Sequence, residues 1–200
     1  MRLRLRRERK MRQIAFVLLA TFLLSGLTVG VPDSAITGPY RISFDLGLPH
    51  DVYSVDLDDP IIDETLGGVK RERYLITITN DTGLSFLTIS VIKLGEAVPG
   101  ISGSAMLQAL DSLDSDPRIS GFQSDIRTID GTSGAIASGT FATTEDIYIT
   151  LYHAVYMLPS DPASTIVQIV STYPWNEGTL QLLKTFHVEE LRGSTEQEVV

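Results

Sequence analysis

The sequence predicts an α+β protein, with an antiparallel sheet of about six or seven strands covered by helices and preceded by one N-terminal membrane helix. Three observations predict this class. Most apolar residues after position 40 alternate with polar ones, as in strands that bury one face. Two later segments instead place apolar residues three or four apart, as in amphipathic helices. The chain also begins with a basic segment followed by a long uncharged apolar run, which is typical of a segment that enters a membrane.

The N-terminus has the layout of an export signal. Residues 1–12 contain seven Arg or Lys and one Glu, whereas residues 14–31 contain no charged residue. As a helix, those 18 residues would be about 27 Å long, close to the roughly 30 Å of a bilayer core. We expect residues 13–31 to be a transmembrane anchor, and a cleaved signal peptide with small residues at 28–30 is the alternative. Because the basic segment stays in the cytoplasm, the rest of the chain is expected outside it, on the cell membrane or secreted.

The exported part of the chain is strongly acidic. The whole chain has 16 Lys and Arg and 25 Asp and Glu; without residues 1–12 the counts are 9 and 24, a net charge of −15. Such a surface repels phosphate backbones, so we expect no nucleic-acid partner. The chain has no cysteine, which excludes disulfides, Cys-ligated zinc and thiol catalysis.

One globular domain is expected over residues 40–189, a length that can bury a core. Residues 32–39 are bounded by prolines and predict a linker. Residues 190–200 are polar and charged and predict a solvated tail.

The strands are expected mainly in two hairpins. RYLITIT and FLTISVI alternate on either side of the turn sequence NDTGLS, which predicts a hairpin over residues 73–92. DIYITLYHAVYML (146–158) and STIVQIVSTY (164–173) form a second pair across PSDPA. Weaker strand candidates are YRISFDL, FQSDIRTID and AIASGTF.

Two helices are expected, near 104–114 and 177–187. Both segments have leucines at helical spacing behind residues that can cap a helix. The leucines expected in the core are Leu107, Leu110, Leu180 and Leu183.

This succession of elements, with the closing passage VQIVSTYPWNEGTLQLLKTFHV, is similar to the PsbP-like family of exported proteins related to the extrinsic subunit of photosystem II. The likeness covers roughly residues 38–190 and depends on the order of elements. It implies an α/β/α sandwich and a role in binding or assembly. It carries no ligand-binding or catalytic residue over to this chain.

Local motifs for chemistry are absent. His50, His153 and His187 are too far apart in sequence to form a metal-binding pair, and His153 alternates with apolar residues, as a hydrogen-bonded core histidine would. Oxygen ligands for Ca²⁺ gather in DLDDPIIDE (56–64) and DSLDSD (111–116), but Pro60 stands where a calcium loop needs Asp or Asn, so solvated loops are expected. We predict no catalytic residue, no metal and no cofactor.

A tyrosine-rich strand is the first choice for a partner-binding surface. Tyr148, Tyr152 and Tyr156 follow one another at intervals of four residues, so they share one strand face. Together with Tyr173 and Trp175 they predict an aromatic surface, since tyrosine combines apolar area with a hydroxyl group. Packing of this stripe in the core is the alternative.

A glycosylation sequon lies in the first hairpin turn. Asn80-Asp81-Thr82 matches N-x-[ST] and would lie on the exported side of the membrane. Modification there depends on the host, and an ordinary Asn-Asp turn explains the same residues.

Together these features predict a membrane-tethered, exported acidic domain that acts as a non-enzymatic binding or assembly module of the cell envelope. Its expected partners are the membrane, through the N-terminal helix, and an envelope protein or small ligand. The alternative is an exported hydrolase whose site is assembled from residues distant in sequence. A cavity that joins a buried carboxylate to His50 or His153 would favour the hydrolase.

Overall fold

The structure, a computed structural model, describes residues 33–65, 68–83, 85–98, 101–142, 148–173 and 178–191. The basic segment 1–12, the expected anchor 13–31 and the final residues 192–200 lie outside this part of the chain. Within the described part, no helix is both long enough and apolar enough to span a bilayer.

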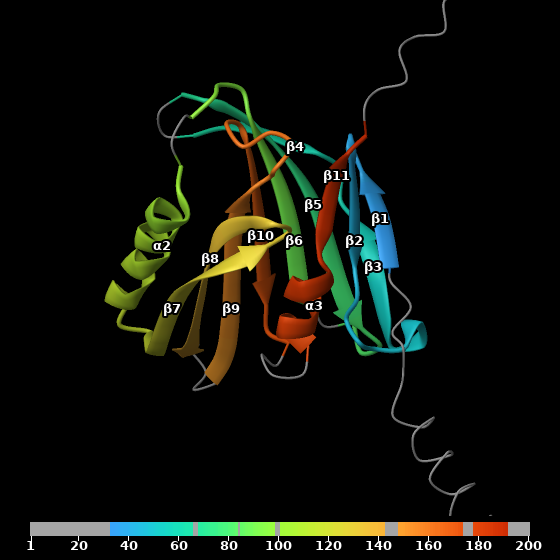
Figure 1. Cartoon of the computed structure of the whole chain (residues 1–200). Coiled ribbons are helices and arrows are strands. Elements are labelled where there is room, and N and C mark those ends of the chain that lie inside the picture. Colours follow the sequence, from blue (N-terminus) through green and yellow to red (C-terminus); the bar gives the residue numbers. More distant parts are fainter. Residues whose placement is uncertain are drawn as a thin grey trace, which may run out of the picture. The chain divides into compact units, whose positions relative to one another are not determined.

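The domain is built from two antiparallel sheets (Figure 1). The smaller sheet has the order β1-β2-β11, with strands β1 (Asp33–Thr37), β2 (Tyr40–Phe44) and β11 (His187–Glu190). The larger, eight-stranded sheet has the order β3-β5-β6-β10-β9-β8-β7, and β4 also pairs with β5. Its strands are β3 (Tyr53–Leu57), β4 (Ile61–Glu64), β5 (Lys70–Asn80), β6 (Ser85–Leu94), β7 (Ile119–Ile129), β8 (Thr132–Ala142), β9 (Tyr148–Met157) and β10 (Thr165–Ser171).

The described residues contain two α-helices, α2 (Gly103–Asp111) and α3 (Leu180–Thr185). The hydroxyl of Ser102 accepts a hydrogen bond from the N–H of Ala105 at 3.2 Å and so caps the start of α2. The described residues also form two short 3₁₀ turns, η1 (His50–Val52) and η2 (Ser112–Ser115).

The main core lies between the two sheets. Alternate residues of the central strands, such as Ile76 and Ile89, point towards the small sheet and are fully buried. The small sheet contributes Ile42 and Phe44, and the residues around α3 contribute Leu182, Leu183 and Phe186. Tyr40 and Tyr74 meet edge to face with ring centroids 5.3 Å apart.

A second core lies on the opposite face of the large sheet, under α2. Met106 and Leu110 of the helix pack on Ala135 and Val155 of the sheet, with Ala137 and Met157 beside them. Residues 134–137 of β8 and 154–157 of β9 are therefore buried on both faces, one against α2 and the other towards the main core.

The expected α/β/α sandwich with about six or seven strands is wrong. One face of the large sheet is covered by a second sheet and the short α3, so the fold is β-rich. The sequence predicts a linker at 32–39, but Asp33–Thr37 forms β1 and pairs with β2. The helix expected over 177–187 ends earlier than predicted: α3 covers Leu180–Thr185, because the backbone becomes extended at Phe186 and continues as β11.

The two predicted hairpins are confirmed. Strand β5 pairs with β6, and β9 pairs with β10, each antiparallel. The helix expected near 104–114 is present as α2. Of the four leucines expected in the core, Leu110 and Leu183 are buried, whereas Leu107 and Leu180 are half-buried.

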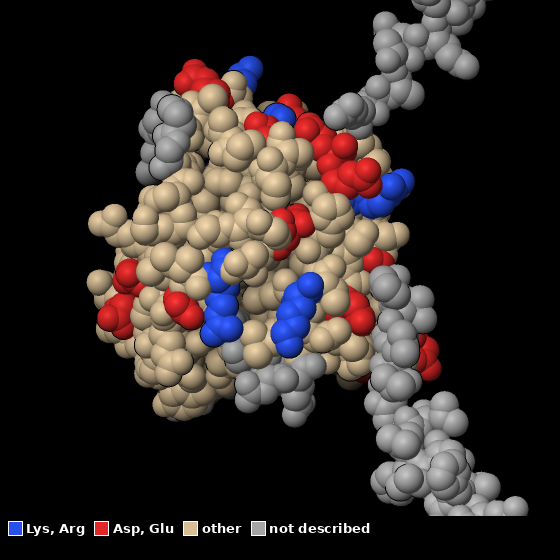
Figure 2. Space-filling view, in the orientation of Figure 1, with Lys and Arg blue, Asp and Glu red and all other residues tan. Residues whose placement is uncertain are grey.

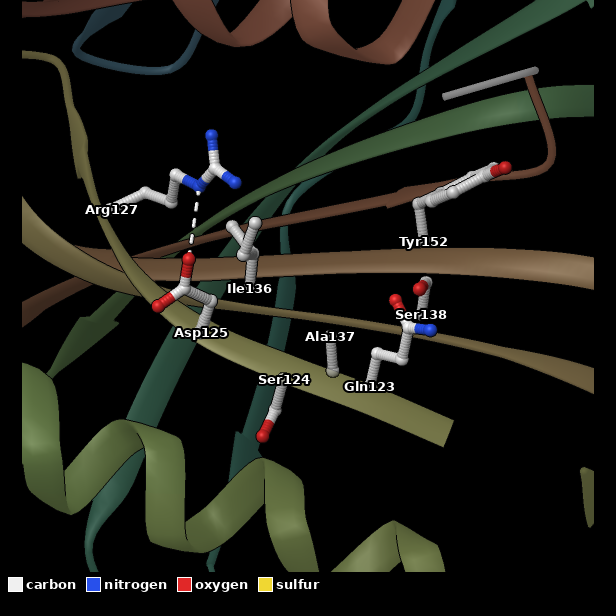
Figure 3. A pocket seen from close by; sticks show the side chains of 8 residues that line it. All are labelled: Gln123, Ser124, Asp125, Arg127, Ile136, Ala137, Ser138 and Tyr152. Carbon is white, nitrogen blue, oxygen red and sulfur yellow. Dashed lines mark ion pairs between the residues drawn. The ribbon is translucent and has the colours of Figure 1, made fainter. Parts of the chain in front are cut away.

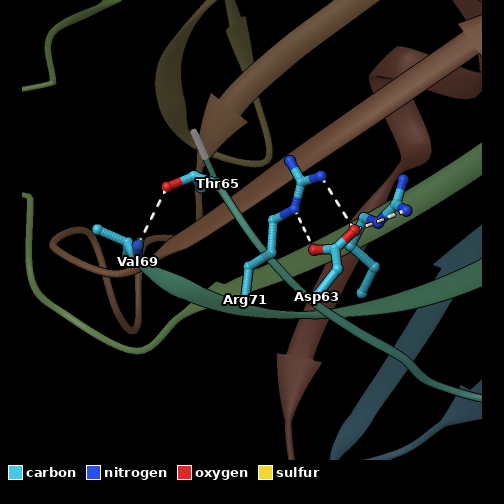
Figure 4. A network of polar contacts seen from close by, with 5 residues as sticks. Asp63, Thr65, Val69 and Arg71 are labelled. Carbon is cyan, nitrogen blue, oxygen red and sulfur yellow. Dashed lines mark hydrogen bonds and ion pairs between the residues drawn. The ribbon is translucent and has the colours of Figure 1, made fainter. Parts of the chain in front are cut away.

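The acidic segment 56–64 contributes to the sheet. Asp63 on β4 binds the guanidinium groups of Arg71 and Arg73 on β5, at 3.0 Å and 3.1 Å. Figure 4 shows the pair of contacts between Asp63 and Arg71. The hydrogen bond from Arg71 is the main cause that lowers the pKa of Asp63. A carboxylate held in this way fixes the register of β4 on β5.

Candidate functional site

A polar groove runs over strands β7, β8 and β9 on the face of the large sheet that points towards the main core. It has a volume of about 480 Å³. The residues that line it include Gln123, Asp125, Arg127, Ser138 and Tyr152. We call this hollow the β7–β9 groove.

The register of the strands explains why these side chains meet. Gln123 is paired with Ser138 across β7 and β8, and Ser138 is paired with Tyr152 across β8 and β9. Directly opposed residues of an antiparallel pair share one face, so the amide, the hydroxyl and the phenol lie in a row. Figure 3 shows them on one side of the sheet, whereas Ser124 points to the other side, towards α2, where its hydroxyl donates to Asp111.

Arg127 gives the groove a positive group in an acidic domain. Its Nε lies 3.3 Å from Oδ2 of Asp125, and the two side chains are 52% and 61% exposed. An ion pair this exposed contributes little stability, so the guanidinium can exchange partners at low cost. Figure 2 shows one Lys or Arg side chain over α3 and another over the strands β7–β9 on this face.

Of the five aromatic residues expected on one surface, the structure describes four, and these four lie in different surroundings. Tyr152 lines the groove, and Tyr148 is 68% exposed at the start of β9. Tyr156 is fully buried in the main core. Tyr173 packs edge to face against Phe86, with ring centroids 5.6 Å apart. Trp175 lies outside the described residues.

His153 lies on the opposite face of β9, between two cavities. The larger has a volume of about 470 Å³ and lies between α2 and strands β9 and β10. The smaller, of about 80 Å³, is lined by apolar residues such as Phe122 and Leu151. Nε2 of His153 is buried without a hydrogen-bond partner, which differs from the hydrogen-bonded core histidine expected. Burial lowers the pKa of this imidazole.

Of the two histidines whose side chains the structure describes, His187 contacts a carboxylate. Its Nδ1 lies 2.6 Å from Oδ1 of Asp130, whose side chain is 6% exposed. The other oxygen, Oδ2, accepts hydrogen bonds from the hydroxyl of Tyr156 and the main-chain N–H of Val188, both at 3.0 Å. Burial, followed by the Asp130 charge, raises the pKa of Tyr156, so its hydroxyl remains a donor.

Sequence reasoning missed Asp130 and the groove residues of β7 and β8. Asp130 has a φ of 50° and Gly131 a φ of 75°, which is the pattern of a two-residue hairpin turn. The dipeptide Asp-Gly between two strand candidates was the available signal. For the groove, the signal was the alternation of Gln123, Asp125 and Arg127, but polar alternation alone does not distinguish a site from a solvated strand.

The described residues contain no group of three or more His, Asp or Glu side chains placed to hold a metal ion. Asn80 lies at the end of β5, where its side chain accepts hydrogen bonds from the N–H and the hydroxyl of Thr82. The side chain of His50 lies outside the described residues.

Comparison with known proteins gave no match among family models, curated proteins or solved structures. The resemblance to the PsbP-like family stays a prediction.

Proposed function

We propose that this chain is a membrane-tethered, non-enzymatic binding module of the cell envelope, and that the β7–β9 groove holds its partner. The observation that carries the proposal is the groove itself, a polar hollow of about 480 Å³ with an arginine and a tyrosine among its lining residues. The basic and apolar segments at the N-terminus supply the expected tether. A tether raises the local concentration of the domain near envelope partners, so a weak site is sufficient.

The groove chemistry suits an extended protein segment that carries a carboxylate. Arg127 can form a paired, charge-assisted contact with that carboxylate in place of its exposed contact with Asp125. Gln123 and Ser138 can each donate to and accept from a peptide group. Tyr152 adds apolar area beside these polar groups.

Site-directed photocrosslinking in cells tests the proposal. A benzophenone amino acid at Gln123, in the groove, should give a crosslinked product with an envelope protein. The same probe at Glu96, an exposed residue after β6, is the matched control and should not give that product.

With the captured partner purified, Arg127→Glu should weaken binding to the full-length chain by about tenfold, or about 1.4 kcal/mol. Lys70→Glu, a charge reversal on exposed β5 surface, should leave the affinity unchanged. Equal crosslinking from both probe positions, or equal binding by both variants, would contradict the groove as the binding site.

The exported hydrolase is kept as a second candidate because of one contact, the His187–Asp130 pair. Ser43 lies opposite His187 in the β2–β11 register, but no hydrogen bond joins the two side chains in the described structure. The residues that line the two cavities at His153 include no carboxylate. A screen of hydrolase substrates on the full-length chain tests this candidate: turnover lost in both His187→Ala and Ser43→Ala would replace the binding proposal.

A further inference from the structure

Strand β7 is the last strand of the large sheet and has one free side. It pairs with β8, and no other strand of the described part of the chain pairs with it. Residues 123–128 of this strand are all exposed. An edge strand presents main-chain N–H and C=O groups that can pair with a further strand. The groove lies on one face of β7, so the proposed function does not use this edge.

The turn between β7 and β8 determines which main-chain groups point outward. The residues that flank a two-residue hairpin turn form a hydrogen-bonded pair, and Ile129 is the one on β7. Such pairs recur at every second residue of an antiparallel ladder, so Ser124, Ile126 and Thr128 direct their main-chain groups away from β8. In agreement, the N–H of Ile126 donates to Oδ1 of its neighbour Asp125, at 2.8 Å.

The residues of this edge are complementary to a second copy of the same strand. Asp125 and Arg127 flank Ile126, and both line the groove face of the sheet. When two copies of β7 pair antiparallel with Ile126 opposite Ile126, each Asp125 lies opposite Arg127 of the other copy. The same register places the outward main-chain groups of Ser124 opposite those of Thr128, so the ladder is continuous over these five residues.

We propose that the domain forms a symmetric dimer through β7, in which the two edge strands pair antiparallel about Ile126 and join the two large sheets. The dimer does not depend on what the groove binds.

The two charges select this register over its neighbours. Because main-chain groups point outward at every second residue, the copies can slide past each other only in steps of two residues. One such step places Asp125 opposite Asp125, and the opposite step places Arg127 opposite Arg127. Like charges directly opposite each other destabilise a strand pair. The register centred on Ile126 is therefore the one in which both charges meet a charge of opposite sign.

Ile126 supplies an apolar centre for the pair. Its side chain lies on the α2 face of the sheet, since a Cβ at Gly103 of α2 would lie 3.6 Å from its Cγ2. It is a large apolar side chain and yet 43% exposed. Opposite its own copy, each Ile126 covers the other, and removing apolar surface from water favours association. The expected membrane tether raises the local concentration of the two copies, so a short strand pair is sufficient.

Disulfide crosslinking of the full-length chain in lipid vesicles tests the dimer. The chain contains no cysteine, so an introduced cysteine provides its single thiol. The two Cα atoms of a hydrogen-bonded pair are about 5.5 Å apart, which suits a disulfide. Under mild oxidation, Ile126→Cys should therefore give about tenfold more crosslinked dimer than Ala97→Cys, which alters an exposed residue after β6.

Two further variants test the register. Ser124→Cys and Thr128→Cys should each crosslink poorly alone, because identical residues four positions out of register lie about 14 Å apart. Reconstituted together, with a tag on one of them, the two variants should form a disulfide-linked heterodimer, since Ser124 lies opposite Thr128 of the other copy.

Charge reversals, each combined with Ile126→Cys, test the ion pairs. Arg127→Glu places carboxylates opposite each other, and Asp125→Arg places guanidinium groups opposite each other. Each change should lower the yield of dimer by about tenfold. A mixture of the two variants places opposite charges together again and should restore the yield as a heterodimer.

The opposite results would overturn the proposal. Equal yields from Ile126→Cys and Ala97→Cys would exclude a dimer through β7. Efficient crosslinking of Ser124→Cys alone would exclude this register, and unchanged yields in both charge variants would exclude the ion pairs. All the altered residues are exposed, and circular dichroism checks that each variant is folded. The vesicles contain no envelope partner, so these outcomes are independent of the crosslinking from Gln123.

Discussion

Asp130 accepts a hydrogen bond from the main-chain N–H of Val188 at 3.0 Å, and this contact joins the turn between β7 and β8 to strand β11 of the small sheet. The same carboxylate binds the hydroxyl of Tyr156 in the main core and Nδ1 of His187. One side chain therefore satisfies a strand N–H, a buried phenol and an imidazole where the two sheets meet. The Asp-Gly turn supplies the backbone conformation that this position requires.

Replacing Asp130 should destabilise the domain markedly. In Asp130→Ala the N–H of Val188 and the hydroxyl of Tyr156 lose their acceptor in a buried place, so we expect a loss of about 2–4 kcal/mol in the free energy of unfolding. Asp125 is an exposed carboxylate on the same strand pair. Asp125→Ala should therefore change the free energy of unfolding by less than about 0.5 kcal/mol. Urea unfolding followed by circular dichroism measures both. Similar losses in the two variants would show that Asp130 does not hold the sheets together.

Gly38→Ala should be far more costly than the same change at Gly83. Gly38 has a φ of 54°, and a Cβ there would lie 2.1 Å from the ring of Tyr74, which is itself packed on Tyr40. Gly83 has a φ of 77°, but a Cβ there would meet nothing within 4 Å. In Gly83→Ala, where only backbone strain is added, we expect the free energy of unfolding to fall by about 1 kcal/mol. In Gly38→Ala, where the clash with Tyr74 is added, we expect it to fall by about 3 kcal/mol or more. Thermal unfolding compares the two, and equal losses would contradict the role of Tyr74.

Asp161 should contribute stability that disappears in acid. Burial raises the pKa of this carboxyl, but hydrogen bonds from Lys93, Ser164 and Thr165 outweigh burial and lower the pKa to about 2. Because the folded-state pKa lies below the ordinary value of 3.8, this stability is fully present above about pH 4 and is lost as the pH falls towards 2.

Unfolding measured at several pH values from 6 to 2 tests this linkage. Asp161→Asn should be less stable than the wild type at pH 6, and the difference should shrink as the pH approaches 2. Asp81→Asn, in the exposed turn after β5, serves as the control and should follow the wild type throughout. A difference independent of pH would exclude the proposed titration.

Local patterns predicted the hairpins, but they did not predict the second sheet. The hairpins over β5–β6 and β9–β10 depend on alternation and a nearby turn, which adjacent residues encode. The small sheet instead pairs Ile42 with Val188, far apart in the chain, through strands of only four or five residues. The spacing of Leu183 and Phe186 also fits a helix, and only the extended backbone at Phe186 reveals the strand that follows.

The surroundings of the tyrosine stripe were not predictable for a related reason. Alternation assigns Tyr152 and Tyr156 to one face, and they do share it. The same face passes from the open groove into the main core within those four residues, because other elements cover only part of the sheet. Coverage by distant elements is set by the tertiary fold and leaves no local mark in the sequence. His153 lies on the other face of β9, and the cavities around it depend on where α2 packs.

The last prediction concerns topology: the N-terminus of the chain lies in the cytoplasm, and the domain lies outside it. Seven basic residues precede an uncharged run at 14–31, and basic flanks stay on the cytoplasmic side. A C-terminal alkaline phosphatase fusion, active only after export, should therefore be active in the full-length chain. Deleting residues 2–31 should abolish that activity. A deletion of residues 192–200 is the matched control and should leave it intact.

Intact mass of the protein recovered from membranes then distinguishes a retained anchor from a cleaved signal. The full-length mass is expected, because an apolar run of 18 residues is longer than the usual 7–15 of a signal peptide. A mass that corresponds to cleavage near residue 30 would make the domain a secreted one, and its partners would then not be limited to those near the membrane. A fusion inactive in the full-length chain but present in the cytoplasm would contradict export itself, and with it the envelope function proposed for the groove.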